Sequence, residues 1–395
     1  MRASERPLRV LVLGGTGCVG EALVRRLGAR GHHVAVFHRG GGAACAGHGA
    51  LHLHGNRLQL EHYASEFAAF APQVVVDLIA GSAPAARRTL RTLAVPGRRL
   101  IFAGSQEVYR AWSVFEGAER VGLEPEPVSE ESRLRCRPPA LPAVSADDDH
   151  SRGWMGEGYD KLGMERAVRA WPGATATVLR LAPVYGPGDR QHRLYPLFRR
   201  MQDGRGVILL PRGWAAWRSA RGYVENMAAG FVLAVEQPRA AGRVYNLADG
   251  ISYSGLEWVL AVGRAFGWRG QVMVAPPRFT PPHLRVQANT AQHCHADTRR
   301  VRVELGYREP VGLGEALAAT LAWERRWSPA EPGERERTQR DYASEDAALL
   351  ALGVAAGAAA GGYRTAKAAN SSAITTNTQT LPSGPTAPPV IQCEP

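Results

Sequence analysis

The sequence predicts an α/β protein built on a doubly wound parallel sheet, with a smaller mixed C-terminal lobe and a flexible tail. Two observations carry this prediction. Short apolar runs, typical of buried parallel strands, alternate with segments of helical period. A glycine-rich turn, residues 14–20, joins the first run to the first helical segment. Repeated strand–helix–strand units pack into a parallel sheet with helices on both faces.

The expected elements follow one another at short intervals. The first helix carries apolar residues at helical spacing and ends near Gly28 and Gly31. Residues 109–154 form a long, polar, proline-rich connection without a helical period, and such connections are usually functional or disordered. Strands are expected at residues 8–13, 34–37, 51–54, 74–78, 99–103 and 177–181, and helices at 159–171, 226–236 and 313–325.

The chain of 395 residues has room for about two domains. Residues 1–185 are expected to form the domain that contains the parallel sheet. Residues 186–326, with short strands, proline-rich turns and helices, are expected to form a smaller lobe interleaved with it. Residues 327–395 have the composition of a low-complexity tail, which we expect to be disordered because its last part has little to bury.

Composition limits the function classes. Lys and Arg number 48 against 36 Asp and Glu, but Lys161 and Lys367 are the only lysines, so we discount the arginine-based excess as a sign of DNA binding. A secretory leader and a membrane span are not expected, which predicts a cytoplasmic protein. The five cysteines are scattered without a CxxC pair and indicate free thiols in a reducing compartment.

The glycine-rich turn, GGTGCVG, indicates a dinucleotide site on a Rossmann-type sheet. Gly14 permits the tight turn, Gly17 lets the backbone approach a pyrophosphate, and Gly20 lets the helix pack close to the strand. The helix N-terminus then faces the anion. The alternative is a turn that merely needs glycines. The residues expected to line the cofactor are Gly14, Thr16, Gly17, Cys18, Val19 and Gly20.

The end of the second strand bears on the choice between NAD and NADP. An NAD site usually has an Asp or Glu there to bind the ribose 2′-hydroxyl. This chain has Phe37-His38-Arg39-Gly40 instead, and a guanidinium suits a 2′-phosphate. We therefore favour NADP and leave NAD open; the alternative for Arg39 is a solvated loop residue.

These motifs resemble the extended short-chain dehydrogenases/reductases, and within them the NAD(P)-dependent epimerase/dehydratase group, over about residues 8–325. The resemblance implies that Asn56 meets the adenine and that Arg221 lies near a substrate diphosphate. It also implies a stretch under the cofactor (Leu78, Ile79 and Ala80), a loop beside the nicotinamide that includes Pro183, and dimers in many members. The similar segments are GGTGCVG, HGNR (54–57), VVVDLIAG (74–81), FAGSQEVY (102–109), LRLAPVYGPGD (179–189), RGYVENMA (221–228) and VYNLADG (244–250).

The chain departs from the family's catalytic pattern at one position. The family uses a Ser or Thr, which maps onto Ser105, and a Tyr followed four residues later by a Lys, which maps onto Lys161. Four residues before Lys161 stands Glu157, not Tyr. The nearest tyrosine, Tyr159, is two residues before Lys161, about 200° away around a regular helix.

Three interpretations of this departure stay open. In the first, Gly156 and Gly158 make the start of the helix irregular, so that Tyr159 reaches the site. Glu157 serves as the acid or base, with Lys161 lowering its pKa. In the third, the chemistry is lost and the fold binds the cofactor as a structural or regulatory ligand. The chain is similar to a less typical branch, in which the fold is kept while the catalytic pattern drifts. That branch includes bacterial members of undefined substrate and plant chloroplast RNA-binding relatives.

Two functions are therefore carried forward. The first is an NADP-dependent oxidoreductase or epimerase/dehydratase-like enzyme that acts on a sugar, a nucleotide-sugar or a related hydroxyl or carbonyl compound. Whether this small-molecule substrate carries a phosphate stays open. The second is a dinucleotide-sensing or RNA-binding protein without turnover. A metal site is not expected at His48, His52 and His54, and the cluster of Arg299, Arg300 and Arg302 is more typical of a solvated face.

Overall fold

The computed structural model describes residues 6–40, 49–138, 158–173, 175–326, 334–354 and 390–392. The chain divides into two compact units, each built from three separate stretches. The first unit comprises Met1–Leu194, Trp217–Ser254 and Gln287–Arg326, and the second comprises Tyr195–Ala216, Gly255–Val286 and Trp327–Pro395.

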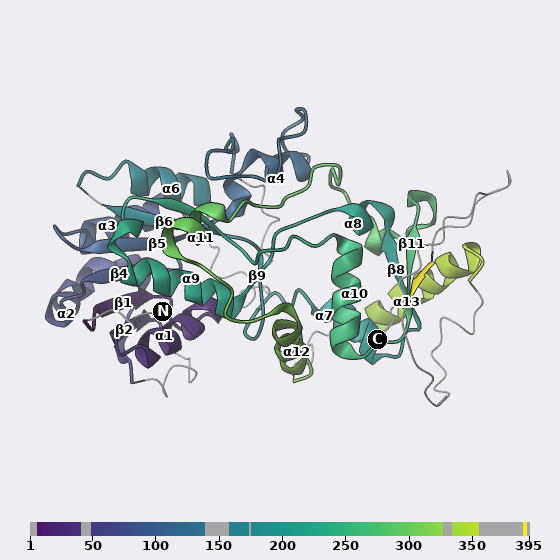
Figure 1. Ribbon diagram of the computed structural model, residues 1–395, viewed down its shortest axis with the longest axis horizontal. Helices are drawn as coiled ribbons and strands as arrows, with labels where there is room; N and C mark the ends of the chain where they lie inside the picture. The colour runs from purple at the N-terminus through teal and green to yellow at the C-terminus, as the bar shows by residue number, and fades with distance from the viewer. Residues whose placement is uncertain are drawn as a thin grey trace. The chain divides into compact units, whose positions relative to one another are not determined.

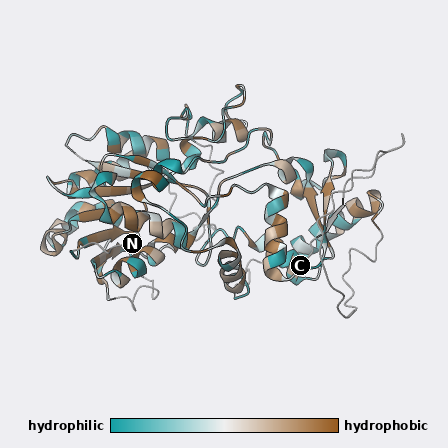
Figure 2. Cartoon of the chain, in the orientation of Figure 1, coloured by the Kyte–Doolittle hydropathy of each residue, from teal (hydrophilic) through white to brown (hydrophobic). Residues whose placement is uncertain are grey.

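The first unit is organised around a seven-stranded sheet in the order β10-β6-β5-β4-β1-β2-β3, in which every neighbouring pair is parallel (Figure 1). Its central strands are formed mostly of buried apolar residues and appear largely brown in Figure 2. The predicted parallel sheet is confirmed. The strands are β1 (Arg9–Leu13), β2 (His33–His38), β3 (Leu51–His54), β4 (Val74–Asp77), β5 (Arg99–Ser105), β6 (Ala176–Leu181) and β10 (Val244–Leu247).

Helices cover both faces of this sheet. The helices α2 (Ala64–Phe70), α3 (Ala83–Leu93) and α6 (Lys161–Arg169) share cores with one face. The helices α1 (Cys18–Ala29) and α9 (Val224–Glu236) pack together on the other face, joined by ion pairs from α1 to α9 (Figure 1). The sheet is therefore doubly wound.

Shorter elements complete the first unit. Two of them differ from the expectations: residues 244–247 join the central sheet as its edge strand, and a helix of six residues lies within the long connection after residue 109. Such a helix is too short to show a period in the sequence. The elements are η2 (Arg57–Tyr63), η3 (Gln106–Val108), α4 (Arg110–Phe115), β7 (Val184–Tyr185), β9 (Gly222–Tyr223), η5 (Pro238–Ala240), α11 (Arg299–Leu305) and α12 (Leu313–Glu324).

The second unit contains a three-stranded sheet in the order β12-β11-β8. Residues 334–351, expected to belong to a disordered tail, form α13, and its Glu345 is buried against Arg200 and His283. The described helices include none long and apolar enough to cross a membrane. The elements are α7 (Tyr195–Gln202), β8 (Val207–Pro211), α8 (Arg212–Ala216), α10 (Gly255–Phe266), β11 (Gln271–Ala275), η6 (Pro277–Phe279), η7 (Pro282–Leu284), α13 (Glu334–Ala351) and β12 (Val390–Gln392).

Candidate functional site

The glycine-rich turn lies between β1 and α1 and is shaped to bring backbone close to a ligand. Gly14 has φ +87, a conformation that favours glycine, and its N–H donates to the Phe37 carbonyl at 3.2 Å. A Cβ on Gly20 would lie 2.2 Å from the Gly14 carbonyl oxygen. Gly17 is the N-cap of α1 and supplies no side-chain cap. The N-terminus of this twelve-residue helix therefore has no side-chain cap, and its first N–H groups can serve an anion.

A second loop closes on the same helix start. The Cys18 thiol donates to the Pro187 carbonyl at 3.4 Å, and a Cβ on Gly188 would lie 3.4 Å from the Cα of Cys18. Burial, followed by the nearby Asp189 carboxylate, raises the pKa of the Cys18 thiol to about 12. Cys18 therefore packs as a neutral thiol and is unsuited to act as a nucleophile.

The carboxyl end of β4 is held by a buried ion pair. The Asp77 carboxylate accepts two hydrogen bonds from Arg57, at 2.9 and 3.0 Å, and one from the Thr89 hydroxyl at 2.7 Å. It also accepts from the backbone N–H groups of Ile79 and Ala80. Burial opposes ionisation of Asp77, but Arg57 and these hydrogen bonds lower its pKa overall. The stretch expected under the cofactor is thereby fixed in position.

Other residues that were expected to line the cofactor lie near this carboxylate or at the ends of β2 and β3. Leu78 donates its N–H to Leu13 at 3.1 Å, and Ile79 packs on Gly14, where a Cβ would meet it at 2.5 Å. Asn56 uses its side-chain oxygen to accept from Leu58 N–H and so caps η2. Arg39 is exposed at the end of β2.

Lys161 begins α6 and points into the sheet edge. Its ammonium donates to the carbonyl oxygens of Ala80 at 2.9 Å and Ala103 at 2.7 Å, which belong to the ends of β4 and β5. The side chain is almost completely buried, and this burial lowers the Lys161 pKa to about 8. Asp160, the N-cap of α6, fixes the helix start by accepting from Gly163 N–H at 2.9 Å.

Tyr159 lies just outside the regular helix. Gly158 has φ +82, and the Asp160 N–H donates to the Gly81 carbonyl at 2.7 Å. The ring of Tyr159 packs against Gly81, where a Cβ would lie 3.3 Å from Cδ2. Because Tyr159 precedes the regular helix, the rotation of about 200° from Tyr159 to Lys161 that a regular helix would impose does not hold here. Glu157 lies outside the described residues.

Glu107, which was not expected from the sequence to belong to the site, interacts with both Tyr159 and Lys161. Its carboxylate is hydrogen-bonded to the Tyr159 hydroxyl, and one carboxylate oxygen, Oε1, is buried with no hydrogen-bond partner among the described residues. Burial raises the pKa of Glu107, against the opposing effects of Tyr159 and Lys161. Burial, the Glu107 charge and the hydrogen bond raise the pKa of Tyr159 well above 10. Tyr159 is therefore a phenol, not a phenolate.

Ser105 ends β5 two residues before Glu107. Its hydroxyl oxygen accepts from the Glu107 N–H at 3.3 Å, which caps the short η3 segment. A hydroxyl that accepts one hydrogen bond still has its own hydrogen to donate. Ser105, Glu107, Tyr159 and Lys161 thus meet at the carboxyl ends of β4 and β5.

The segments expected to contact substrate meet in the same unit. The Arg221 guanidinium donates to the Ser219 and Tyr253 carbonyls at 3.2 and 3.1 Å, and burial lowers its pKa to about 10. The Pro183 carbonyl accepts from Gly222 N–H at 3.0 Å. Asp249, after β10, accepts from Tyr223 N–H and Asn226, and burial raises its pKa to about 6.

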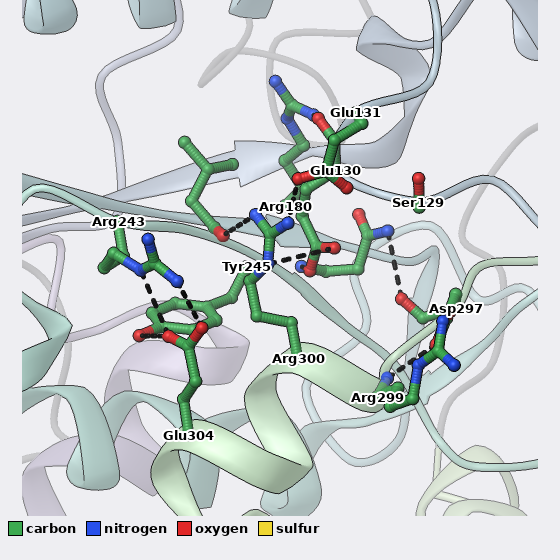
Figure 3. A network of polar contacts seen from close by, with 12 residues as sticks. Ser129, Glu130, Glu131, Arg180, Arg243, Tyr245, Asp297, Arg299, Arg300 and Glu304 are labelled. Atoms are coloured by element: carbon green, nitrogen blue, oxygen red, sulfur yellow. Dashed lines mark hydrogen bonds and ion pairs between the residues drawn. The ribbon is translucent and has the colours of Figure 1, made fainter.

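A buried polar network supports the edge of the sheet where β6 and β10 end; its Arg180 is labelled in Figure 3. Glu165 and Arg180 form an ion pair at 2.8 Å with both side chains almost completely buried. Arg180 also donates to the Tyr109 hydroxyl at 2.9 Å, and Tyr109 donates to Asn246 at 2.6 Å. The network fixes the loop that follows Ser105 relative to both strands.

The arginine cluster at α11 is neutralised by acidic neighbours. Arg299 pairs with Asp297 at 3.0 Å, Arg300 with Glu131, and Arg302 with Glu309 (Figure 3 shows the first two). Among the described residues, no group of three or more His, Cys, Asp or Glu side chains is arranged to hold a metal ion.

The sequence matches the model of the NAD dependent epimerase/dehydratase family over residues 10–125 and 157–248. Among characterised relatives, the chain is 29% identical over 255 residues to the 2′-dehydrokanamycin reductase of Streptomyces kanamyceticus, covering 63% of this chain and 64% of that one. It is 31% identical over 169 residues to the dTDP-glucose 4,6-dehydratase of Streptomyces griseus, covering 40% and 47%. The chain thus spans less than two thirds of the length of these relatives.

Solved structures share the fold. The UDP-glucuronic acid 4-epimerase from Bacillus cereus, solved with UDP-glucuronic acid and NAD, superposes with a TM-score of 0.59 at 16% identity. The match covers 81% of this chain and 99% of that one. Likeness at this identity establishes the Rossmann-type fold and leaves activity to be argued from the residues.

Proposed function

Because the chain belongs to the NAD dependent epimerase/dehydratase family, we propose that it is an NAD(P)-dependent oxidoreductase acting on a sugar, a nucleotide-sugar or a related hydroxyl or carbonyl compound. The observation that carries the proposal is the meeting of Ser105, Glu107, Tyr159 and Lys161 at one edge of the sheet. The glycine-rich turn opens at the same edge, because the carboxyl ends of parallel strands lie together.

The residues present fit a dinucleotide. The uncapped N-terminus of α1 and the close approach at Gly20 suit a pyrophosphate, and the Asp77–Arg57 pair fixes the stretch below it. When bound, the nicotinamide supplies or accepts hydride. We assign the ribose contact to Lys161, whose Nζ has one hydrogen left after donating to two carbonyls. Arg39 favours the 2′-phosphate of NADP.

The remaining groups handle the substrate oxygen. Ser105 donates its hydroxyl hydrogen to the substrate carbonyl, and Tyr159 gives its proton to the oxygen as hydride reaches the carbon. In this proposal Glu107 holds a proton, a state that the burial-raised pKa of its carboxyl favours. Tyr159 recovers its proton from this carboxyl, and Glu107 ends as carboxylate. In the oxidative direction the same protons move in reverse. The raised pKa of Tyr159 keeps its hydroxyl protonated, which is the form that a proton donor to a substrate carbonyl must have.

A cofactor titration followed by turnover assays tests the proposal. In a titration followed by nicotinamide fluorescence, the protein should bind NADPH more tightly than NADH. Absorbance at 340 nm should show that NADPH is consumed when a carbonyl substrate is added. The panel would hold nucleotide-4-keto-sugars and 2′-dehydrokanamycin, the substrate in the name of a relative. Absence of binding by both nucleotides would overturn the proposal.

Two variants then test the assigned roles. Tyr159→Phe removes the proton donor and should lower kcat on the order of 100-fold or more, the usual scale for general acid–base catalysis, while leaving NADPH affinity unchanged. Tyr245→Phe, which changes a buried tyrosine hydroxyl bonded to Glu304 away from the site, is the matched control. None of the comparisons favours the alternative of a binding protein without turnover.

A further inference from the structure

Three histidines form a cluster at the carboxyl ends of β2 and β3. The His38 and His52 nitrogens, Nε2 and Nδ1, lie 3.0 Å apart, and the ring of His38 lies 4.5 Å from that of His54 between centroids. His38 is buried, His52 is partly buried and His54 is exposed. Nothing in the proton chemistry described above uses these imidazoles.

The hydrogen bonds fix the protonation of the buried member. His38 Nδ1 accepts from the Gly40 N–H at 3.2 Å, so this nitrogen carries no hydrogen. The hydrogen therefore lies on Nε2, which donates to His52 Nδ1. Burial, with the charges of His54 and His52, lowers the pKa of His38. His38 is therefore a neutral member of the cluster and holds His52 in place through this hydrogen bond.

The cluster borders the glycine-rich turn. The residue before His38 accepts the Gly14 N–H through its carbonyl at 3.2 Å, and the His38 carbonyl accepts the Gly55 N–H at 2.9 Å. Arg39 follows directly and is exposed. The histidines therefore lie where the second strand meets the turn, which is the position from which a Rossmann-type sheet reads the adenosine ribose.

The charged groups on the packed elements are engaged elsewhere. Arg57 of η2 binds Asp77, and Tyr63 of the same segment accepts from the Asn56 N–H. On α1, Arg25 and Arg26 pair with Glu225. Glu61 lies 4.0 Å from Arg88, and His62 is exposed. Among the described groups, the charges that act on His38 come from His52 and His54.

We propose that His52 and His54, held in place by His38, make the preference for a 2′-phosphorylated dinucleotide depend on pH. The inference rests on the proposed dinucleotide cofactor. Histidine gains charge between pH 8 and 5, whereas a phosphate monoester keeps most of its second charge above about pH 6. Between pH 8.0 and 6.5 the cluster gains positive charge beside Arg39 while the phosphate stays largely dianionic.

The test is a pair of affinity titrations, with NADPH and with NADH, at pH 8.0 and 6.5 and constant ionic strength, followed by nicotinamide fluorescence. The ratio of NADPH to NADH affinity should rise about tenfold toward pH 6.5, the scale of one charge-assisted hydrogen bond. In the double variant His52→Gln/His54→Gln the ratio should stay flat. Arg39→Ala should lower the ratio at both pH values and keep its slope.

Matched controls separate the possible results. His33→Gln changes an exposed histidine at the opposite end of β2 and should preserve the pH response. Unchanged NADH affinity in the double variant at pH 8.0 shows that the site is intact. If both nucleotides bind and the wild-type ratio is flat, or if the double variant keeps the response, the histidine inference is overturned and the proposed function stands. If neither nucleotide binds, both fall.

Discussion

The stability of the protein above pH 8 should depend on Lys161 in a predictable direction. In the folded chain the Lys161 pKa is lowered to about 8 by burial, from an ordinary value of 10.5. Between these two values the unfolded chain holds a proton that the folded chain has lost. The free energy of unfolding therefore rises with pH in this interval. The contribution is complete above about pH 10.5 and is lost as the pH falls to about 8.

The size of the effect follows from the displacement of the pKa. Each pH unit between the two values contributes about 1.4 kcal/mol, so the full interval from 10.5 to about 8 contributes roughly 3 kcal/mol. Lys161→Met keeps an unbranched side chain of similar length and has no proton to lose. The thiols and phenols, which titrate in the same pH range in the unfolded chain, are common to both proteins and cancel in the comparison.

Urea unfolding of the wild type and Lys161→Met at pH 7, 8.5 and 10 measures this difference. The wild type should gain about 2 to 3 kcal/mol relative to the variant between pH 7 and 10. A difference that stays constant over this range would refute the reasoning. It would mean that the carbonyl oxygens of Ala80 and Ala103 hold the ammonium charged in the folded protein despite its burial.

Three further predictions concern the site and its support. Glu107→Gln should lower kcat on the order of 100-fold. In the wild type kcat should fall with rising pH as Glu107 loses its proton, and this fall should be absent from the variant. If kcat of the variant still falls with rising pH, Glu107 is excluded as the proton source. Glu165→Ala leaves Arg180 buried without its carboxylate and should cost about 3–5 kcal/mol in urea unfolding, and a loss under 1 kcal/mol would contradict a buried pair. Gly20→Ala places a Cβ 2.2 Å from a carbonyl oxygen and should abolish NADPH binding seen by fluorescence, whereas Gly314→Ala, in open space on α12, should leave it unchanged.

Much of the fold could be predicted because it depends on local patterns. The predicted strand at residues 99–103 falls within β5, since apolar runs are needed wherever a strand is covered on both faces. The edge strand β10 was not expected. Its four residues belong to a segment that was assigned to the C-terminal lobe from the sequence. Their pairing with β6 is a long-range contact, which a local sequence pattern does not reveal.

The site could be predicted only in part. The glycine-rich turn and Lys161 were found because one is a local backbone requirement and the other is a rare residue in a matching motif. Glu107 was missed because a carboxylate after a strand is ordinary in sequence. Its contact with Tyr159 arises when the Gly158 turn and the Gly81–Asp160 hydrogen bond bring the start of α6 to the end of β5.

The sequence by itself determined the parallel α/β sheet, the dinucleotide turn and the order of Ser105 and Lys161, because strand apolarity and glycine geometry are properties of neighbouring residues. The tertiary structure decided how Tyr159 stands to Lys161, which carboxylate it meets, and which side chains gather at the end of β2. These relations depend on burial and on contacts between distant segments. The same burial displaces the pKa values of Glu107, Tyr159 and Lys161, on which the proposed chemistry depends.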